Sequence, residues 1–148
     1  ILTIDTDISV SISELNKWLK IKNIKFYNNI FFGSRNLKNS IVKFEYHRKL
    51  IGLVFIFLTK LFFNIKLNDT QCGFKLYPKK VGKKIFKNLM DKGFAHDIEI
   101  VLLAKRYNIK ILEMPITWVH KNNSKINFLR DSLNIFFSLK KIKKRFSY

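Results

Sequence analysis

The segment 69–75 carries the densest group of side chains in this chain that could do chemistry. It places the carboxylate of Asp69, the amide of Gln71 and the ammonium of Lys75 around Gly73, directly after a strongly apolar run. A buried carboxylate needs a partner, and Lys75 is the nearest candidate in the sequence. We therefore expect a tight, partly buried turn that forms part of a functional site.

Asp5 and Asp7 form a second acidic group in a chain that has only 10 acidic residues. They follow the apolar stretch 1–4, and side chains two residues apart in extended chain point the same way. Carboxylates are the oxygen ligands that Mg²⁺ or Mn²⁺ prefers, so the pair suits a divalent cation that bridges to a diphosphate. An ordinary turn with two aspartates is the alternative.

Asp97 and Glu99 form the third acidic group, at the beginning of a predicted helix. Side chains two residues apart on a helix point to different sides, although both would lie near its positive end. A place in the site and simple helix capping are both open for this pair.

Two arginines stand where phosphate could be bound. Arg35 follows Gly33 at the end of a predicted strand, and Arg48 precedes a long apolar run. A guanidinium group binds phosphate oxygens through two parallel hydrogen bonds, which an ammonium cannot do. By contrast, we expect Arg106 and Arg145 to be surface charges on helices.

Composition indicates one basic globular domain. The chain has 148 residues, 47% of them hydrophobic with 15 Phe, and a formal charge of +19. The positive electrostatic field of such a charge attracts phosphate groups in nucleic acid, lipid head groups or small molecules. Many of the lysines could instead be ordinary solvated surface residues. The single cysteine excludes an intramolecular disulfide, and the three histidines lack the spacing of a Cys/His metal site.

Apolar periodicity predicts strands that alternate with helices, and open sheets of this kind bind ligands just past their strand ends. In the first helix we expect Ser11 or Ser13 as the cap and Leu15, Trp18 and Leu19 inward. The strands are expected over 1–4, 30–32 and 109–119, and the helices over 12–20, 77–90, 97–107 and 131–146.

Two segments have the composition of helices that bind to a membrane surface. The segment near 48–66 is too short and interrupted for a transmembrane helix, so an interfacial helix and a buried core helix are both open. The basic amphipathic helix near 131–146 has apolar residues at Leu133, Phe136, Phe137, Leu139 and Ile142, and its basic end at 140–145 suits anionic lipid.

Read together, these residues resemble the family-2 glycosyltransferases that charge polyprenyl phosphates, the dolichyl-phosphate glucosyl- and mannosyltransferase group. The order and spacing of seven blocks over most of the chain make the resemblance specific, and the form of 69–75 is closer to the glucosyl branch. The blocks are Asp5-Thr6-Asp7-Ile8-Ser9, Gly33-Ser34-Arg35, Arg48 before the apolar segment, 69–75, 93–99, 113–118 and Ser124-Lys125.

The resemblance implies a Rossmann-like α/β fold of the GT-A type whose N-terminal portion is missing, so that 1–148 would be the C-terminal part of one catalytic domain. It implies transfer of a hexose, with glucose favoured, from a nucleotide-sugar such as UDP-glucose to a polyprenyl (dolichyl-type) phosphate. The reaction would take place at the cytoplasmic face of a membrane and would use Mg²⁺ or Mn²⁺.

The resemblance also implies a role for each matching residue. It assigns the metal and the donor diphosphate to Asp5 and Asp7, further donor contacts to Lys75, Ser124 and Lys125, the acceptor phosphate to Arg35 and Arg48, and the reaction centre to Asp69, Asp97 and Glu99.

The chain departs from the family pattern at two positions: His96 replaces a usual aromatic residue and Ser11 a usual proline. Neither change removes a charge that the mechanism needs. We expect the nucleotide-binding strand with which family members begin to lie in a preceding segment or a split partner. The alternatives are an inactive membrane-surface fragment and a basic nucleic-acid-binding module; the latter is disfavoured because the aromatic residues fall in apolar runs.

Overall fold

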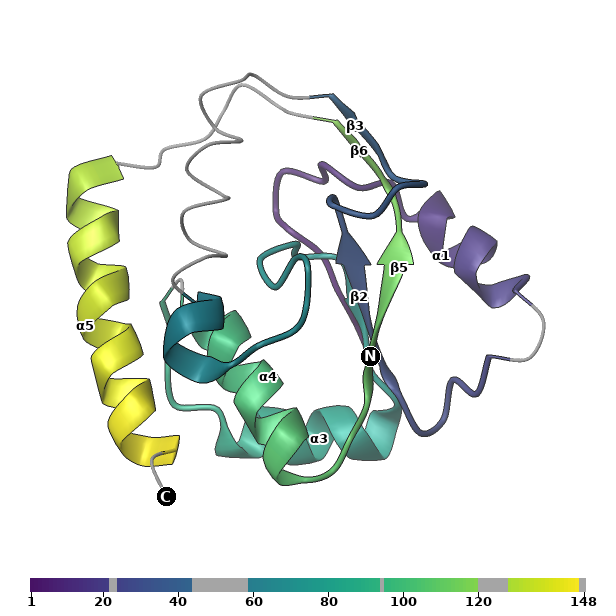
Figure 1. The fold of residues 1–148 in the computed structure, drawn as a ribbon. Coiled ribbons are helices and arrows are strands. Elements are labelled where there is room, and N and C mark those ends of the chain that lie inside the picture. The colour runs from purple at the N-terminus through teal and green to yellow at the C-terminus, as the bar shows by residue number, and fades with distance from the viewer. Residues whose placement is uncertain (22–23, 44–58, 94, 120–127, 147–148) are drawn as a thin grey trace.

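A mixed four-stranded sheet lies at the centre of the computed structural model, which describes residues 1–21, 24–43, 59–93, 95–119 and 128–146, the side chains of 128–136 excepted (Figure 1). Strand β4 runs antiparallel to β1 and β2, whereas β2 and β5 are parallel. The predicted α/β class is confirmed, with a mixed sheet. In spatial order the strands are β1 (Leu2–Thr3), β4 (Lys75–Leu76), β2 (Ile30–Ser34) and β5 (Ile111–Pro115).

The strand predicted over 109–119 divides into two. Pro115 ends β5, and Ile116 then donates its N–H to the hydroxyl of Ser40 instead of to β2. Beyond that point the chain pairs in parallel with β3 (Ile41–Lys43) as strand β6 (Thr117–Val119). The sequence pattern missed β3 and β4 because each has only two or three residues, too few for a periodicity.

Each predicted helix is present. They are α1 (Ser13–Leu19), α3 (Lys79–Asn88), α4 (His96–Arg106) and α5 (Phe128–Phe146). Helix α5 begins three residues earlier than predicted.

Two details of the first predicted helix were wrong. Ile12 occupies the N-cap position of α1, where no side chain caps the helix, and Ser11 instead accepts a hydrogen bond from the N–H of Ser13. Leu19 of the same helix was expected to face inward, but it is 54% exposed.

Two apolar clusters cover the two faces of the sheet. On β2, Ile30 and Phe32 belong to the cluster formed with α3, α4 and the C-terminal half of α5, whereas Phe31 packs with Trp18 of α1. Successive side chains of a strand point to opposite faces, so β2 is buried on both sides. In Figure 1, α1 accordingly lies on one side of the sheet and α3 and α4 lie on the other.

The membrane-like segment near 48–66 is described only in its last part, since 48–58 lie outside the described residues. Residues 59–63 are helical, with Thr59 buried and Leu61 and Phe62 exposed. Within the described ranges, no helix is long and apolar enough to cross a bilayer.

Gly33 of β2 offers a test of this packing. A Cβ atom there would lie 3.0 Å from the carbonyl oxygen of Phe74 and from Ile116 Cγ2, and 3.2 Å from Cys72 Sγ. We expect Gly33→Ala to lower the free energy of unfolding by about 1–3 kcal/mol, because the backbone carbonyl of Phe74 cannot move away from the new methyl group without strain. Urea denaturation measures this change. At Gly93 the nearest contact would be an ordinary 3.5 Å, so Gly93→Ala is the matched control. Equal stability of Gly33→Ala and the wild type would contradict this account.

Candidate active site

Three strands bring the candidate residues to one edge of the sheet. Because β4 is antiparallel to β1 and β2, the carboxyl ends of β1 and β2 lie at the same edge as the amino end of β4. Asp5 follows β1, Arg35 follows β2, and the segment 69–73 leads into β4. Three of the predicted site blocks therefore meet where an α/β sheet places its ligands.

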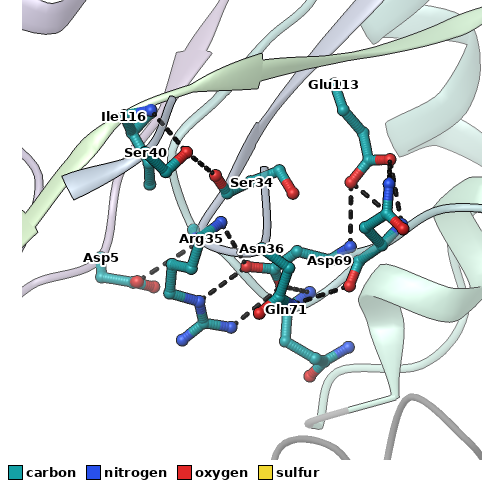
Figure 2. A network of polar contacts seen from close by, with 11 residues as sticks. Asp5, Ser34, Arg35, Asn36, Ser40, Asp69, Gln71, Glu113 and Ile116 are labelled. Carbon is teal, nitrogen blue, oxygen red and sulfur yellow. Dashed lines mark hydrogen bonds and ion pairs between the residues drawn. The ribbon is translucent and has the colours of Figure 1, made fainter. Parts of the chain in front are cut away.

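Asp69 is paired with Arg35, so the expectation that Lys75 would be its partner was wrong. The carboxylate is 1% exposed and accepts Arg35 Nε at 2.7 Å and Nη2 at 2.9 Å. It also accepts the backbone N–H groups of Arg35 and Gln71, both at 3.0 Å (Figure 2). A carboxylate has about four acceptor positions, and these four bonds occupy them. Burial alone would raise the pKa of Asp69, but the hydrogen bonds and charge of Arg35 outweigh it and lower that pKa.

Glu113 of β5 holds the backbone that carries Asp69. Its carboxylate accepts the N–H of Asp69 at 2.9 Å and both the N–H and the side-chain amide of Asn68 at 2.9 Å (Figure 2). Glu113 belongs to the block 113–118 of the family resemblance, which carried no predicted role. The sequence signal that could have indicated its role is a single acidic residue in an otherwise apolar strand.

Lys75 is paired with Asp97. The two charged atoms are 2.7 Å apart, and both side chains are almost fully buried. Asp97 Oδ1 also lies 3.0 Å from His96 Nε2. Burial acts to raise the pKa of Asp97, but Lys75 and then His96 lower it below the ordinary value. This pair joins the beginning of α4 to β4.

Asp5 and Asp7 lie in a turn, so the extended chain assumed for them was wrong. The N–H of Ile8 donates to the carbonyl of Asp5 at 3.0 Å, and Ile8 has a φ of 51°. Asp7 accepts the N–H and the hydroxyl of Ser9, at 3.0 and 2.7 Å. Asp5 accepts the N–H of Gly73 at 3.2 Å, and burial raises the pKa of Asp5 even though Lys75 opposes this.

Gly73 leaves room for the Asp5 carboxylate. A Cβ atom at this position would lie 2.0 Å from Asp5 Oδ1, so no larger residue fits without displacing that group. Across the described part of the chain, no three His, Cys, Asp or Glu side chains gather as metal ligands. Asp5 and Asp7 could offer a cation one or two carboxylates, a donor set that would suit Mg²⁺ bound together with substrate phosphates and water.

Glu99 points to the other side of α4 from Asp97, as the helix periodicity requires. The buried carboxylate accepts the N–H groups of Met90 and Asp91 at 3.0 and 2.7 Å and forms an ion pair with Arg145 of α5. The expectation that Arg145 is a surface charge was wrong. The place of Glu99 at the reaction centre stays a prediction.

Three predicted site residues, Arg48, Ser124 and Lys125, lie outside the described residues. Their roles in binding phosphate stay predictions.

The contact between His96 and Asp97 predicts a pH dependence of stability. The hydrogen bond to Asp97 raises the pKa of His96 above 6.5, its ordinary value. The stabilisation from His96 is therefore fully present below pH 6.5 and is lost as pH rises through the higher pKa of the folded state. We expect the wild type to exceed His96→Gln in free energy of unfolding by more at about pH 5.5 than at about pH 9.

The stability advantage of the wild type over His96→Gln should change by less than ~1 kcal/mol between the two pH values, because solvent screens the imidazole, which is 43% exposed. Urea denaturation of both proteins at both pH values measures it, and the other titrating groups cancel in the comparison. A stability difference that does not change with pH would contradict the account.

Comparison with known proteins identifies several glycosyltransferases as relatives. No model of a known protein family matches the chain. A dolichyl-phosphate beta-glucosyltransferase of Saccharomyces cerevisiae is 41% identical over 83 residues, which are 56% of this chain and 23% of that protein. One of Trichomonas vaginalis is 30% identical over 131 residues, covering 85% of this chain and 40% of the relative. The glycosyltransferase AglD of Haloferax volcanii is 24% identical over 88% of this chain and 21% of its own length.

The chain thus spans about a quarter of the length of the Saccharomyces relative. Similarity to several dolichyl-phosphate beta-glucosyltransferases extends over more than half of the chain. The resemblance predicted from the motifs is therefore confirmed: the chain is similar in sequence to the dolichyl-phosphate glucosyltransferase group of family-2 glycosyltransferases.

Proposed function

We propose that residues 1–148 form the C-terminal part of a GT-A catalytic domain that transfers a hexose from a nucleotide-sugar to a polyprenyl phosphate of the dolichyl type. Glucose is the favoured sugar and UDP-glucose the favoured donor. The observation that carries the proposal is the meeting of Asp5, the Arg35–Asp69 pair and the Lys75–Asp97 pair at one edge of the sheet. These residues belong to the blocks that resemble the glucosyltransferases.

Sugar transfer to a phosphate acceptor requires positive charge that binds the phosphate and a fixed orientation of the acceptor towards the sugar. A phosphate acceptor is already an anion at neutral pH, so its oxygen can attack the sugar carbon without a strong base. Arg35 has five N–H donors in its guanidinium and gives two of them to Asp69, which leaves others for the acceptor phosphate. Asp69 has filled acceptor positions and a lowered pKa, so it serves the site by orienting Arg35.

Asp5 and Asp7 would hold Mg²⁺ or Mn²⁺ together with the donor diphosphate. The bound cation would supply positive charge to the nucleoside diphosphate as it leaves. Ser9 orients the Asp7 carboxylate and Gly73 leaves space for that of Asp5. Lys75, held by Asp97, contributes positive charge close to Asp5, on whose pKa it acts.

A membrane surface would deliver the lipid-linked acceptor, and we place it on the cytoplasmic side. Exposed apolar and basic side chains lie together on α5 and the neighbouring 59–63 stretch. Lys143 lies 5.2 Å from the centre of the Phe62 ring, and Leu61 and Phe137 are exposed. Apolar contact and lysine charge together favour binding to anionic lipid.

Loss of the metal ligand should abolish transfer. In the full-length protein we expect Asp7→Asn to lower transfer of glucose from UDP-glucose to dolichyl phosphate by about 100-fold or more, because the metal-bound charge is lost. The asparagine oxygen can still accept the N–H of Ser9 and the NH₂ group can donate to the Ser9 hydroxyl oxygen, so the turn should survive. Asp91→Asn is the matched control, since the Asp91 carboxylate accepts, from the part of the chain that the structure describes, only the N–H of the nearby Gly93. Unchanged turnover in Asp7→Asn, or full activity in the presence of EDTA, would refute the metal role.

Membrane binding can be tested separately from transfer. Lys140, Lys141 and Lys144 are exposed on α5, and each should contribute about 1 kcal/mol on anionic lipid. We expect their replacement by Gln to weaken binding to phosphatidylserine vesicles about 100-fold in co-sedimentation. The same change at the exposed Lys79, Lys80 and Lys83 of α3 removes equal charge elsewhere and should have a much smaller effect. Equal losses for the two triple variants would show that net charge alone drives binding.

A further inference from the structure

We propose that Glu113 is a positioning residue, which fixes the Asp69 carboxylate and thereby the direction of the Arg35 guanidinium. The inference rests on the proposed function, in which Arg35 binds the acceptor phosphate. Glu113 itself contacts the backbone and side chain of Asn68 and the backbone of Asp69.

The contacts of Glu113 converge on two adjacent residues. Oε1 accepts the Asp69 N–H at 2.9 Å, while Oε2 accepts the Asn68 N–H and Asn68 Nδ2, both at 2.9 Å. The carbonyl of Asn68 in turn accepts Asn36 Nδ2 at 2.8 Å. The loop that begins at Asn68 is therefore tied to β5 on one side and to the residues after β2 on the other (Figure 2).

The sheet makes this arrangement rigid. Glu113 is paired in register with Phe32 of β2, three residues before Arg35. Glu113 thus lies on β5 and Arg35 directly follows β2, and these two parallel strands are hydrogen-bonded to each other. Asp69 is held between the two residues. A site whose polar groups are supported from regular elements keeps its geometry better than one supported by loops alone.

The position of Arg35 depends on this support. Among the described residues, the hydrogen bonds to the Asp69 side chain come from Arg35 and Gln71, so its carboxylate follows the loop that Glu113 holds. In Glu113→Gln the two N–H groups and the amide would face one carbonyl oxygen and one NH₂ group, which cannot accept all three hydrogen bonds. The loop would then shift, and the guanidinium would shift with it.

The Nε–H of Arg35 gives a direct readout, because it donates to Asp69 Oδ2 at 2.7 Å. In ¹⁵N NMR spectra of this chain we expect the Arg35 Nε–H signal to exchange slowly with solvent in the wild type. Glu113→Gln should shift the signal and speed its exchange. Glu14→Gln, which removes a buried carboxylate paired with Lys17 on α1, is the matched control and should leave the signal unchanged.

Steady-state kinetics of the full-length protein provide a second test of the proposal. We expect Glu113→Gln to raise KM for dolichyl phosphate about 10-fold or more while KM for the nucleotide-sugar changes little, because misplacement of a binding group acts on the ligand it holds. A residue that only stabilises the fold would not separate the two substrates. Glu113→Asp keeps the charge but shortens its reach, so it should change both readouts in the same direction and carries the test if Glu113→Gln does not fold.

An Arg35 Nε–H signal that is the same in the wild type and in the folded Glu113 variants would overturn the proposal. Equal changes in both KM values would overturn it as well. Absence of any glucosyl transfer by the wild-type protein would instead overturn the proposed function, while the NMR comparison would still decide whether Glu113 positions Arg35.

Discussion

The Asp69 carboxylate is buried, and the arrangement of the whole site depends on how its charge is compensated. An unpaired buried carboxylate would become protonated or would destabilise the fold strongly. Arg35 supplies both a positive charge and matched donors, so the carboxylate stays ionised and the guanidinium is held in one direction. Lys75 compensates the buried carboxylate of Asp97 in the same way. A chain with a formal charge of +19 has few acidic side chains, and it places these two in buried pairs.

The sheet supplies the rigidity that such pairs need. Strand β2 is covered on both faces by apolar clusters, so its end at Ser34 is fixed relative to β5 and β4. Arg35 follows directly, and Glu113 reaches the loop before Asp69 from the neighbouring strand. Buried ion pairs contribute less to stability than apolar contacts of similar size. In this protein their value lies in the geometry that they impose.

A third ion pair, between the buried Glu99 and Arg145, joins the helices. Glu99 accepts two N–H groups of the connection between α3 and α4, and Arg145 reaches it from near the end of α5. Arg145 Nη2 also donates to the carbonyl of Asn88 at 2.9 Å. The two carboxylates of the 97–99 block therefore serve different neighbours, one towards β4 and one towards α5. The basic end of α5 is thereby fixed to the body that carries the site.

The sequence by itself determined which elements form and which residue types are available for chemistry. Helices α1, α3, α4 and α5 and strand β2 follow from apolar periodicity, because that signal is local. The blocks that contain Asp5, Arg35, Asp69 and Asp97 could also be recognised in the sequence, because each is a short run of neighbouring residues. Only the tertiary structure decided which charges pair. The bonds from Arg35 to Asp69, from Asp69 to Glu113 and from Arg145 to Glu99 join residues 34, 44 and 46 positions apart. Lys75 is nearer to Asp69 in the chain, but β4 directs it to Asp97, because strand pairing and helix packing set distances that sequence separation does not.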